Sequence, residues 1–489
     1  MIKQIPEGLA FDDVLLVPAF SDVQPANVDT SVYLTPEIKL NIPFLSAGMD
    51  TVTEAKMAIA LARCGGLGII HRHMSVQAQA SEVDKVKRSE HGVISDPFSL
   101  SPNHYVYEAN KLMEKYRISG VPITEHDQLV GIITNRDLRF ETDYSKKIYE
   151  VMTKLPLITA PVGTTLDEAK EILIRHRVEK LPIVDEKGNL KGLITVKDIN
   201  KAIKYPLSAK DSQGRLLVGA AVGIKDDFLE RVHALAKRKV DVIALEVFHG
   251  HAKKVIEAIQ SIKGDFPHVA IIAGNVATGS ATKALIEAGA DIIKVGIGPS
   301  SVSTKRVIAG IGVPQVSAII DCALAAKDTN TPIIADGGIR YSGDITKALA
   351  AGATACMMGN LFAGCEESPG TTELFQGRKY KVYRGMEIAG YDDHIGEGSR
   401  FSPENGYTGP SSVRISKGVE GRITFKGELS EVLHQLMGGL GVGMSYAGCS
   451  TISELHARAE FVKVTTAGLR EGHPHDVQVI RESPNYNIL

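Results

Sequence analysis

Residues 291–306 combine the side chains and backbone turns that chemistry on an anionic ligand requires. The apolar run Ile292–Val295 is typical of a short buried strand. Gly296 and Gly298 follow it and allow the backbone to turn sharply and approach a ligand closely. Hydroxyl side chains come next, at residues 300–304. A strand, a glycine turn and hydroxyl donors in this order favour an anion site in a parallel α/β fold, although a purely structural loop has the same pattern.

The elements that would position this loop alternate between strands and helices. Helical segments such as Asp227–Arg238 and Ala281–Ala288 separate a series of apolar runs that predict strands. The predicted strands are Ile42–Ser46, Gly66–His71, Leu217–Val222, Asp241–Val247, Val269–Asn275, Ile292–Gly296, Ile333–Asp336 and Ala355–Gly359. This alternation predicts an α/β protein with a closed (β/α)8 TIM barrel, in which ligand groups lie at the C-terminal ends of the strands.

An internal repeat interrupts the barrel. The sequence Ile118–Ile123 is matched by Val178–Ile183, and Gly131–Asp137 is matched by Gly192–Asp198. Two copies of a unit too small to bury its own apolar face are expected to pack on each other. The predicted domains are a first barrel part at 1–92, repeat halves at 93–150 and 151–205, and a second barrel part at 206–489.

The composition is that of an ordinary globular enzyme, with 44% hydrophobic and 23% charged residues. A formal net charge of −2 gives no reason to expect nucleic acid or a membrane as a partner. No apolar run approaches the roughly 20 residues of a membrane span, and no signal peptide is visible. The five cysteines show no metal-type pairing and are expected to be free thiols. We therefore expect a cytoplasmic protein.

The ordered motifs resemble the IMP dehydrogenase/GMP reductase family over nearly the whole chain. The matching segments include Phe11–Pro18, Met49–Glu54, Ala273–Val276, Gly312–Gln315, Ala335–Asp344, Glu366–Gly370, Tyr383–Met386 and His473–Asp476. The repeat resembles a tandem pair of cystathionine-β-synthase (CBS) modules inserted in the barrel. Within the family the dehydrogenases are the better match, because of this insert and the tail, whereas the reductases share the barrel.

The resemblance implies a chemistry. In this family a cysteine thiolate adds to C2 of inosine 5′-monophosphate (IMP), and hydride leaves to NAD. A mobile flap, here at about residues 387–420, then closes, and water hydrolyses the intermediate to xanthosine 5′-monophosphate (XMP). A thiol suits the nucleophile's role because it can be substantially ionised near neutral pH. A homotetramer, or an octamer through the CBS modules, is implied in the same way.

The same resemblance assigns ligand contacts. A purine mononucleotide would be bound by Ser301, Asp336, Gly338, Gly359, Asn360, Tyr383, Met386 and Lys417. Potassium would be bound by the backbone carbonyls of Gly296, Gly298 and Ser303. In the CBS pair, an ATP- or GTP-type nucleotide would contact Thr134, Asp137, Thr195 and Asp198. The two threonines can also cap helices through their hydroxyls, and both roles are compatible.

The departures from the family pattern lie on the reactive side of the predicted site. Ser303 occupies the nucleophile position, and a serine hydroxyl is a far weaker acid than a thiol and needs an adjacent base. Lys305 stands where threonine is usual. Arg400 is followed by Phe401, so the tyrosine hydroxyl that helps to activate water is missing. The dinucleotide position carries Glu246, Val247 and Phe248, followed by Asn275 after the next strand. The family usually has an acidic residue and two small ones there, so NAD binding is in question.

Three hypotheses follow. In the first, the chain is an IMP dehydrogenase by lineage whose chemistry is lost or very slow. In the second, it is a catalytically silent purine-nucleotide sensor or the partner of an active homologue. In the third, it performs other chemistry on a purine nucleotide, with Glu246, Lys305, Glu387 and Lys417 as an acid/base set. A simpler interpretation of these charges is a solvated barrel mouth.

Overall fold

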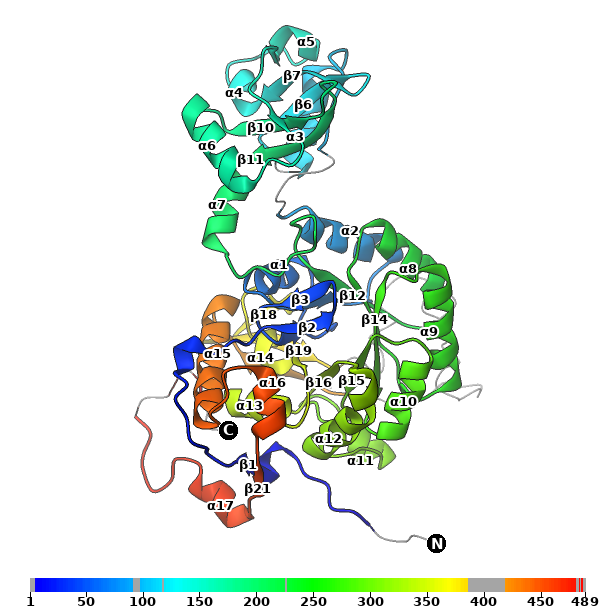
Figure 1. Ribbon diagram of the computed structural model, residues 1–489, viewed down its shortest axis with the longest axis vertical. Coiled ribbons are helices and arrows are strands. Elements are labelled where there is room, and N and C mark those ends of the chain that lie inside the picture. Colours follow the sequence, from blue (N-terminus) through cyan, green and yellow to red (C-terminus); the bar gives the residue numbers. More distant parts are fainter. Residues whose placement is uncertain are drawn as a thin grey trace. The chain divides into compact units, whose positions relative to one another are not determined.

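The computed structural model describes residues 5–90, 97–116, 118–224, 227–385, 418–480, 483, 485 and 486. The chain forms two compact units (Figure 1). The first unit consists of residues 1–89, 207–211 and 216–489, and the second of residues 90–206 and 212–215. The second unit is therefore an insertion in the chain of the first.

The first unit is built on a closed barrel of parallel strands. In chain order these are β4 (Phe44–Ser46), β5 (Leu67–Ile70), β12 (Val218–Val222), β13 (Val242–Leu245), β14 (Ala270–Val276), β15 (Ile292–Val295), β16 (Ile333–Asp336) and β17 (Ala355–Met358). The barrel closes where β12 pairs with β5 and where β17 pairs with β4. The (β/α)8 barrel predicted from the sequence is confirmed, and the inserted unit follows its second strand.

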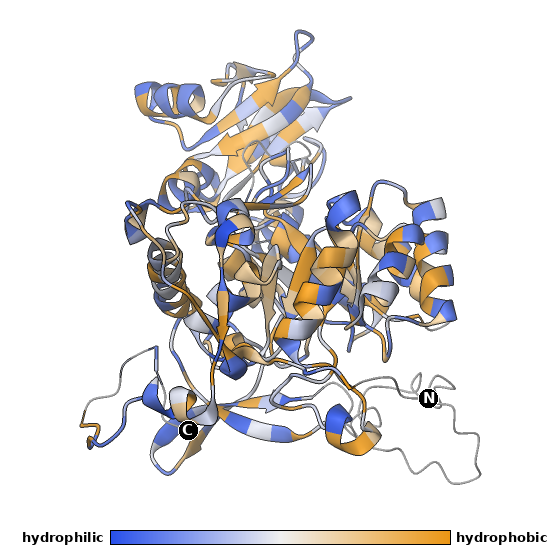
Figure 2. Ribbon diagram, turned by 60° about the horizontal axis from the view of Figure 1, so that its bottom comes forward, coloured by the Kyte–Doolittle hydropathy of each residue, from blue (hydrophilic) through white to orange (hydrophobic). Residues whose placement is uncertain are grey.

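Helices cover the outside of the barrel. They are α1 (Ala55–Arg63), α2 (Val76–Lys87), α8 (Phe228–Lys237), α9 (Lys253–Asp265), α10 (Gly279–Glu287), α12 (Gln315–Ala326) and α13 (Ser342–Ala350). Figure 2 shows the barrel strands mainly in orange and much of the helices' outer surface in blue. The apolar residues of the barrel strands are buried and belong to one core with residues of the surrounding helices, as expected for a parallel sheet that is buried on both faces.

A glycine-rich helix is longer than the sequence predicts. The low helix propensity of glycine favours a helix end near residue 438, but α15 runs over Leu429–Tyr446, through the glycine-rich residues 438–443. A Cβ atom at Gly439 would lie 2.1 Å from the hydroxyl oxygen of Ser342 in α13. Glycine thus permits close packing of α15 on α13, and this tertiary contact outweighs the low helix propensity of glycine.

A small antiparallel sheet flanks the predicted flap. It consists of β18 (Thr372–Phe375), β19 (Arg378–Arg384) and β20 (Glu420–Thr424). β20 begins at Glu420, where the predicted flap segment, at about residues 387–420, ends. Arg384 pairs in register with Glu420, which places the two described ends of the flap segment side by side. The predicted flap residues Met386, Glu387, Arg400, Phe401 and Lys417 lie outside the described residues.

Shorter elements complete the first unit. They are η1 (Phe11–Asp13), β1 (Val14–Leu16), η2 (Pro25–Asn27), β2 (Val32–Thr35), β3 (Ile38–Leu40), α11 (Lys305–Ala309), η3 (Lys327–Thr329), α14 (Asn360–Ala363), α16 (Ile452–Arg458), β21 (Phe461–Lys463) and α17 (Thr466–Glu471). Among the described residues, no helix is long and apolar enough to span a membrane.

The inserted unit contains two similar halves. The first comprises α3 (Val106–Tyr116), β6 (Gly120–Glu125), β7 (Gln128–Thr134), α4 (Asn135–Leu138), α5 (Ile148–Val151) and β8 (Thr153–Lys154). The second comprises β9 (Ala160–Pro161), α6 (Leu166–His176), β10 (Lys180–Val184), β11 (Leu190–Thr195) and α7 (Val196–Lys204). Each half has its own apolar core. The hairpin turns of the halves meet, because Leu129 N–H donates to Gly188 O over 3.1 Å and Leu190 N–H to Asp127 O over 2.9 Å. The halves are therefore in contact at these turns, while the packing of one apolar face on the other stays a prediction.

Candidate functional site

A cluster of hydrogen-bond donors forms where the loops after β15, β16 and β17 meet. The amide Nδ2 of Asn360 donates to the hydroxyl oxygen of Ser301 over 3.0 Å. A Cβ atom at Gly359 would lie 2.7 Å from the Tyr383 hydroxyl oxygen, so the absence of a side chain allows this close approach. Gly338, with a φ of +79°, lies against Pro299 of the loop after β15. These residues, which the resemblance assigns to the purine mononucleotide, therefore lie on neighbouring loops.

Tyr383 is the buried member of this cluster, with 4% of its surface exposed. Burial raises the pKa of Tyr383 to about 12, against the opposing effect of hydrogen bonds with Ser300 and Ser301, and the charge of Asp336 adds to the rise. The phenol is therefore protonated at neutral pH. Its hydroxyl donates to Met49 Sδ over 3.8 Å, a weak hydrogen bond that a stronger acceptor such as an anion could replace.

A buried ion-pair network lies at the adjoining strand ends. Lys294, in the middle of β15, has a side chain that is 1% exposed. Its Nζ atom lies 2.6 Å from Glu246 Oε1 and 3.2 Å from Asp336 Oδ2. Asn275 Nδ2 also donates to Asp336 Oδ2, over 2.8 Å. Burial alone would lower the pKa of Lys294, but the two carboxylates more than offset this and raise it above its ordinary value.

The sequence interpretation missed Lys294. Its signal was a lysine inside the otherwise apolar strand Ile292–Val295. A lysine is almost never fully buried unless it is paired, so such a position requires a carboxylate on a neighbouring strand.

The predicted dinucleotide segment after β13 has two different environments. Glu246 points toward Lys294 and is held in the ion pair, with 12% of its side chain exposed. Val247 packs against the main apolar core. Phe248 is 48% exposed, and the Lys305 ammonium lies 5.4 Å from the centre of its ring. The fold thus brings Phe248 and Lys305 together, at a distance at which a cation and an aromatic face attract each other.

Ser303 lies on the loop that joins β15 to α11. Its N–H donates to Ser300 O over 3.2 Å, and its hydroxyl oxygen accepts from the N–H of Lys305 over 3.4 Å. Within the described part of the chain, neither a carboxylate nor an imidazole bonds this hydroxyl. The loop is anchored to the C-terminal end of the flap segment, because Val419 N–H donates to Val302 O over 3.0 Å and Ser303 forms a β-bridge with Gly418.

The glycines of the same loop adopt backbone conformations that favour glycine, with φ of +149° at Gly296 and +79° at Gly298. The carbonyl oxygen of Gly296 accepts from Asn275 Nδ2 over 2.9 Å. The loop is therefore tied to the neighbouring strand end. Binding of potassium by Gly296, Gly298 and Ser303 stays a prediction.

Comparison with known proteins assigns the fold to a family. The model of the IMP dehydrogenase/GMP reductase domain matches residues 8–475. The chain belongs to the IMP dehydrogenase/GMP reductase family.

Individual members of the family are similar over nearly the full length. Inosine-5′-monophosphate dehydrogenase of Halalkalibacterium halodurans is 59% identical over 483 residues, which cover 99% of this chain and 98% of that one. The enzyme of Bacillus subtilis is 58% identical over 485 residues, with the same coverage. Among solved structures, a cysteine-to-alanine variant of GMP reductase from Trypanosoma brucei, in complex with guanosine 5′-monophosphate, superposes with a TM-score of 0.87 at 38% identity. That match covers 97% of this chain and 99% of the reductase.

No cysteine of this IMP dehydrogenase/GMP reductase family member is disposed to form a thiolate. All five are free thiols: Cys64, Cys322, Cys356, Cys365 and Cys449. Burial raises the pKa of each of them, to about 11 for Cys322 and about 12 for Cys365. Burial thus disfavours the thiolate form of all five, and the replacement of the family's nucleophile by Ser303 stays a prediction.

The predicted nucleotide residues of the inserted unit form local hydrogen bonds. In the second repeat the hydroxyl of Thr195 accepts from Asp198 N–H over 3.3 Å and caps α7. In the first repeat Asp137 accepts from Thr134 N–H over 2.7 Å and from the Thr134 hydroxyl over 2.6 Å. Burial raises the pKa of Asp198, which is 8% exposed. The capping interpretation is confirmed for Thr195, and nucleotide binding stays a prediction.

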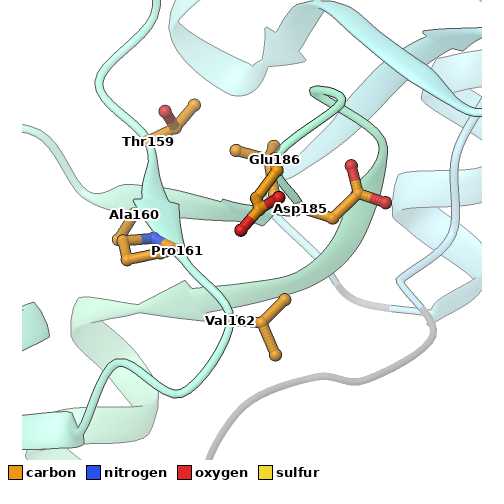
Figure 3. A pocket seen from close by; sticks show the side chains of 7 residues that line it. Thr159, Ala160, Pro161, Val162, Asp185 and Glu186 are labelled. Carbon is orange, nitrogen blue, oxygen red and sulfur yellow. The ribbon is translucent and has the colours of Figure 1, made fainter.

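A pocket of about 370 Å³ lies elsewhere in the inserted unit, beside β9 and β10 (Figure 3). Its lining residues are Thr159, Ala160, Pro161, Val162, Val184, Asp185 and Glu186. None of the four predicted nucleotide residues lines it. Its only charged lining groups are the carboxylates of Asp185 and Glu186, which disfavour a phosphate there.

Proposed function

We propose that this family member binds a purine nucleoside 5′-monophosphate at the barrel mouth and that its NAD-dependent oxidation of IMP to XMP is lost or very slow. The observation that carries the proposal is the contrast between an assembled donor cluster at Ser301, Asn360 and Tyr383 and a serine at position 303 that has no base among the described residues. The names of the relatives, and the guanosine 5′-monophosphate in the related reductase structure, support the class of ligand.

The binding half of the proposal follows from the donor cluster and from Asp336. The hydroxyls of Ser301 and Tyr383 and the amide of Asn360 would donate to phosphate oxygens, and the absence of a side chain at Gly359 lets the Tyr383 hydroxyl come close to this loop. The carboxylate of Asp336 would accept hydrogen bonds from the ribose hydroxyls. Met386 and Lys417 would contact the purine, as the family pattern implies.

The slow-chemistry half follows from the nucleophile. Addition to C2 of the purine requires an ionised attacking group, and among the described residues no carboxylate or imidazole bonds the Ser303 hydroxyl to take its proton. A loss of three powers of ten in rate corresponds to about 4 kcal/mol in the barrier. The missing tyrosine hydroxyl at Phe401 would slow the later hydrolysis as well.

NAD use is what membership in the family implies, and NAD would supply a hydride acceptor when bound. The residues at the dinucleotide position fit a flat ring in part. The exposed face of Phe248 can stack on an aromatic group, while Lys305 beside it presents a positive charge. Glu246 is held by Lys294, which also argues against its action as a free base in other chemistry.

Titration calorimetry with IMP, XMP, GMP, AMP and NAD, together with an assay for XMP and NADH, tests the proposal. We expect binding of at least one purine monophosphate and little or no NADH from IMP and NAD. The B. subtilis relative, assayed side by side, is the positive control. Failure of every purine monophosphate to bind would refute the binding half, and turnover equal to that of the relative would refute the slow-chemistry half.

We also propose that the inserted unit is a CBS pair that binds an ATP- or GTP-type nucleotide at the seam between the repeats. Lys180 supports this, because its side chain is only 8% exposed and the Glu179 carboxylate lies 4.0 Å from its ammonium. Burial lowers the pKa of Lys180, and although Glu179 opposes this, the charges of Lys197 and Arg136 lower it further. A ligand phosphate would neutralise this cluster of cations beside Asp137.

Binding of a fluorescent ATP or GTP analogue measures this second proposal. Lys180→Met should weaken binding about tenfold, because it removes one charged contact. Lys191→Met, at an exposed lysine that pairs with Asp185, is the control and should change little. Light scattering with and without the nucleotide would test the tetramer and octamer that the resemblance implies.

A further inference from the structure

Three barrel strands place one lysine and two carboxylates next to one another. Glu246 directly follows β13, Lys294 lies in β15, and Asp336 ends β16. The Lys294 ammonium is within hydrogen-bond distance of both carboxylates and is closer to Glu246, at 2.6 Å, than to Asp336, at 3.2 Å. A single buried cation is thus shared, and neither carboxylate could be buried beside the other at low cost without it.

The two oxygens of Asp336 are used differently. Lys294 and Asn275 both donate to Oδ2, over 3.2 and 2.8 Å. Among the described residues, none donates to Oδ1, and the Asp336 side chain is 22% exposed. The Nε2 of buried Gln315 also holds the main-chain oxygen of Asp336, over 3.2 Å. The carboxylate is therefore fixed on one side and has one oxygen left to accept from a ligand.

We propose that Lys294, oriented by Glu246, is a positioning residue that keeps Oδ1 of Asp336 available for the ribose hydroxyls and thereby determines selectivity for ribonucleotides. The inference rests on the proposed binding of a purine monophosphate at this mouth. In this role Glu246 contributes to ribose recognition through Lys294, in addition to its place in the predicted dinucleotide segment. Loss of the shared cation would leave two carboxylates facing each other, so Asp336 would turn away or bind a proton.

The hydroxyl selectivity of the site is the quantity to measure. It is the dissociation constant of 2′,3′-dideoxyinosine 5′-monophosphate divided by that of IMP. Both ligands carry the same phosphate and base, so the ratio isolates contacts to the sugar hydroxyls. Lys294→Met should lower the ratio about tenfold, because a hydrogen bond to a charged group is lost or misplaced. Lys294→Arg, which keeps the charge, should retain most of the selectivity.

A second buried lysine provides a matched control. Lys87, 3% exposed, lies 3.0 Å from an Asp211 carboxylate oxygen and 2.7 Å from one of Asp241. Lys87→Met removes the same kind of shared cation at the opposite ends of the barrel strands. Both Lys87→Met and Lys294→Met should lower the unfolding temperature. Only Lys294→Met should change the hydroxyl selectivity.

The double variant Glu246→Gln/Lys294→Met tests the part played by Glu246. Removal of the opposing carboxylate should restore part of the selectivity that Lys294→Met loses. An unchanged ratio in Lys294→Met, or a double variant no better than Lys294→Met, overturns the inference. If neither nucleotide binds the unmodified protein, the proposed function fails instead. Retained binding of the dideoxy nucleotide shows that a variant is folded and that its phosphate subsite is intact.

Discussion

The two sides of the barrel mouth differ in how their polar groups are satisfied. On the phosphate and ribose side, Asn360 bonds Ser301, and Lys294 and Asn275 bond Asp336. On the other side, the Ser303 hydroxyl accepts one long hydrogen bond, from the backbone N–H of Lys305, among the described residues. Recognition of an anion and a diol requires only fixed donors and acceptors, whereas covalent attack requires an ionisable group and a base. On the proposed account, the same mouth binds a nucleotide without transforming it.

The largest expected effect is a gain of chemistry on the reactive side. Ser303→Cys should raise the rate of NADH formation from IMP by up to about three powers of ten, since about 4 kcal/mol of barrier separates the two nucleophiles on this account. Steady-state absorbance of NADH measures it, with Ser303→Ala as the inactive control. The rate should stay below that of the B. subtilis relative, because Phe248, Lys305 and Phe401 also depart from the family pattern. Full recovery would show that these other residues are tolerated.

The next largest effect is expected on the side proposed to bind phosphate and ribose, from loss of the ribose acceptor Asp336. Asp336→Asn removes a charged acceptor and leaves Lys294 to Glu246 alone, so IMP affinity should fall by about 2 kcal/mol, or roughly thirtyfold. Calorimetry measures the change. Asp328→Asn, at an exposed aspartate in η3, is the control. If the Asp336→Asn variant binds IMP normally, Asp336 does not contact the ribose.

A smaller effect is expected from the phosphate donor. Tyr383→Phe removes one hydroxyl and should weaken IMP binding by about 1 kcal/mol, or roughly fivefold. Inosine, which has no phosphate, should bind the variant and the unmodified protein equally. Equal weakening of both ligands would mean that the ring supports the fold of the site and that its hydroxyl does not contact phosphate.

Phe248→Ala should separate the two sides most cleanly, with an effect of about 1 kcal/mol confined to NAD. The ring is exposed, so its removal leaves no large internal cavity. Affinity for NAD should fall a few-fold while affinity for IMP is unchanged. An exposed aromatic of the small sheet, Phe375, offers the control Phe375→Ala. If NAD does not bind the unmodified protein, the dinucleotide half-site has been lost.

The smallest effect concerns pH. The folded-state pKa of Tyr383 is about 12, above the ordinary value of 10. The folded state holds this proton more tightly than the unfolded state does. The contribution of Tyr383 to folding stability is therefore fully present below pH 10 and is lost as pH rises toward 12. Over that window Tyr383→Phe should lose less stability than the unmodified protein, by about 1.4 kcal/mol per pH unit at most. Urea unfolding at pH 9, 10 and 11 measures the difference, and parallel losses would contradict the assignment.

The sequence alone determined the framework. Apolar runs bounded by glycine or charge located the barrel strands, and β16 has the bounds that its run predicts, because buried parallel strands are continuously apolar. The repeat predicted two halves that pack on each other, and glycines next to hydroxyls predicted the loops that meet at the mouth. These features are local, so periodicity and residue type reveal them.

Tertiary structure decided what depends on partners distant in the chain. It paired Lys294 with Glu246 and Asp336. Glu246, which the sequence offered as a possible base, is therefore an ion-pair partner of a buried lysine. It set Lys305 beside Phe248, and it continued α15 through a glycine run that propensity alone would end. The physical reason is the same in each case. The energy of a charge or of a glycine depends on what packs against it, and the fold brings those partners together from different strands and helices.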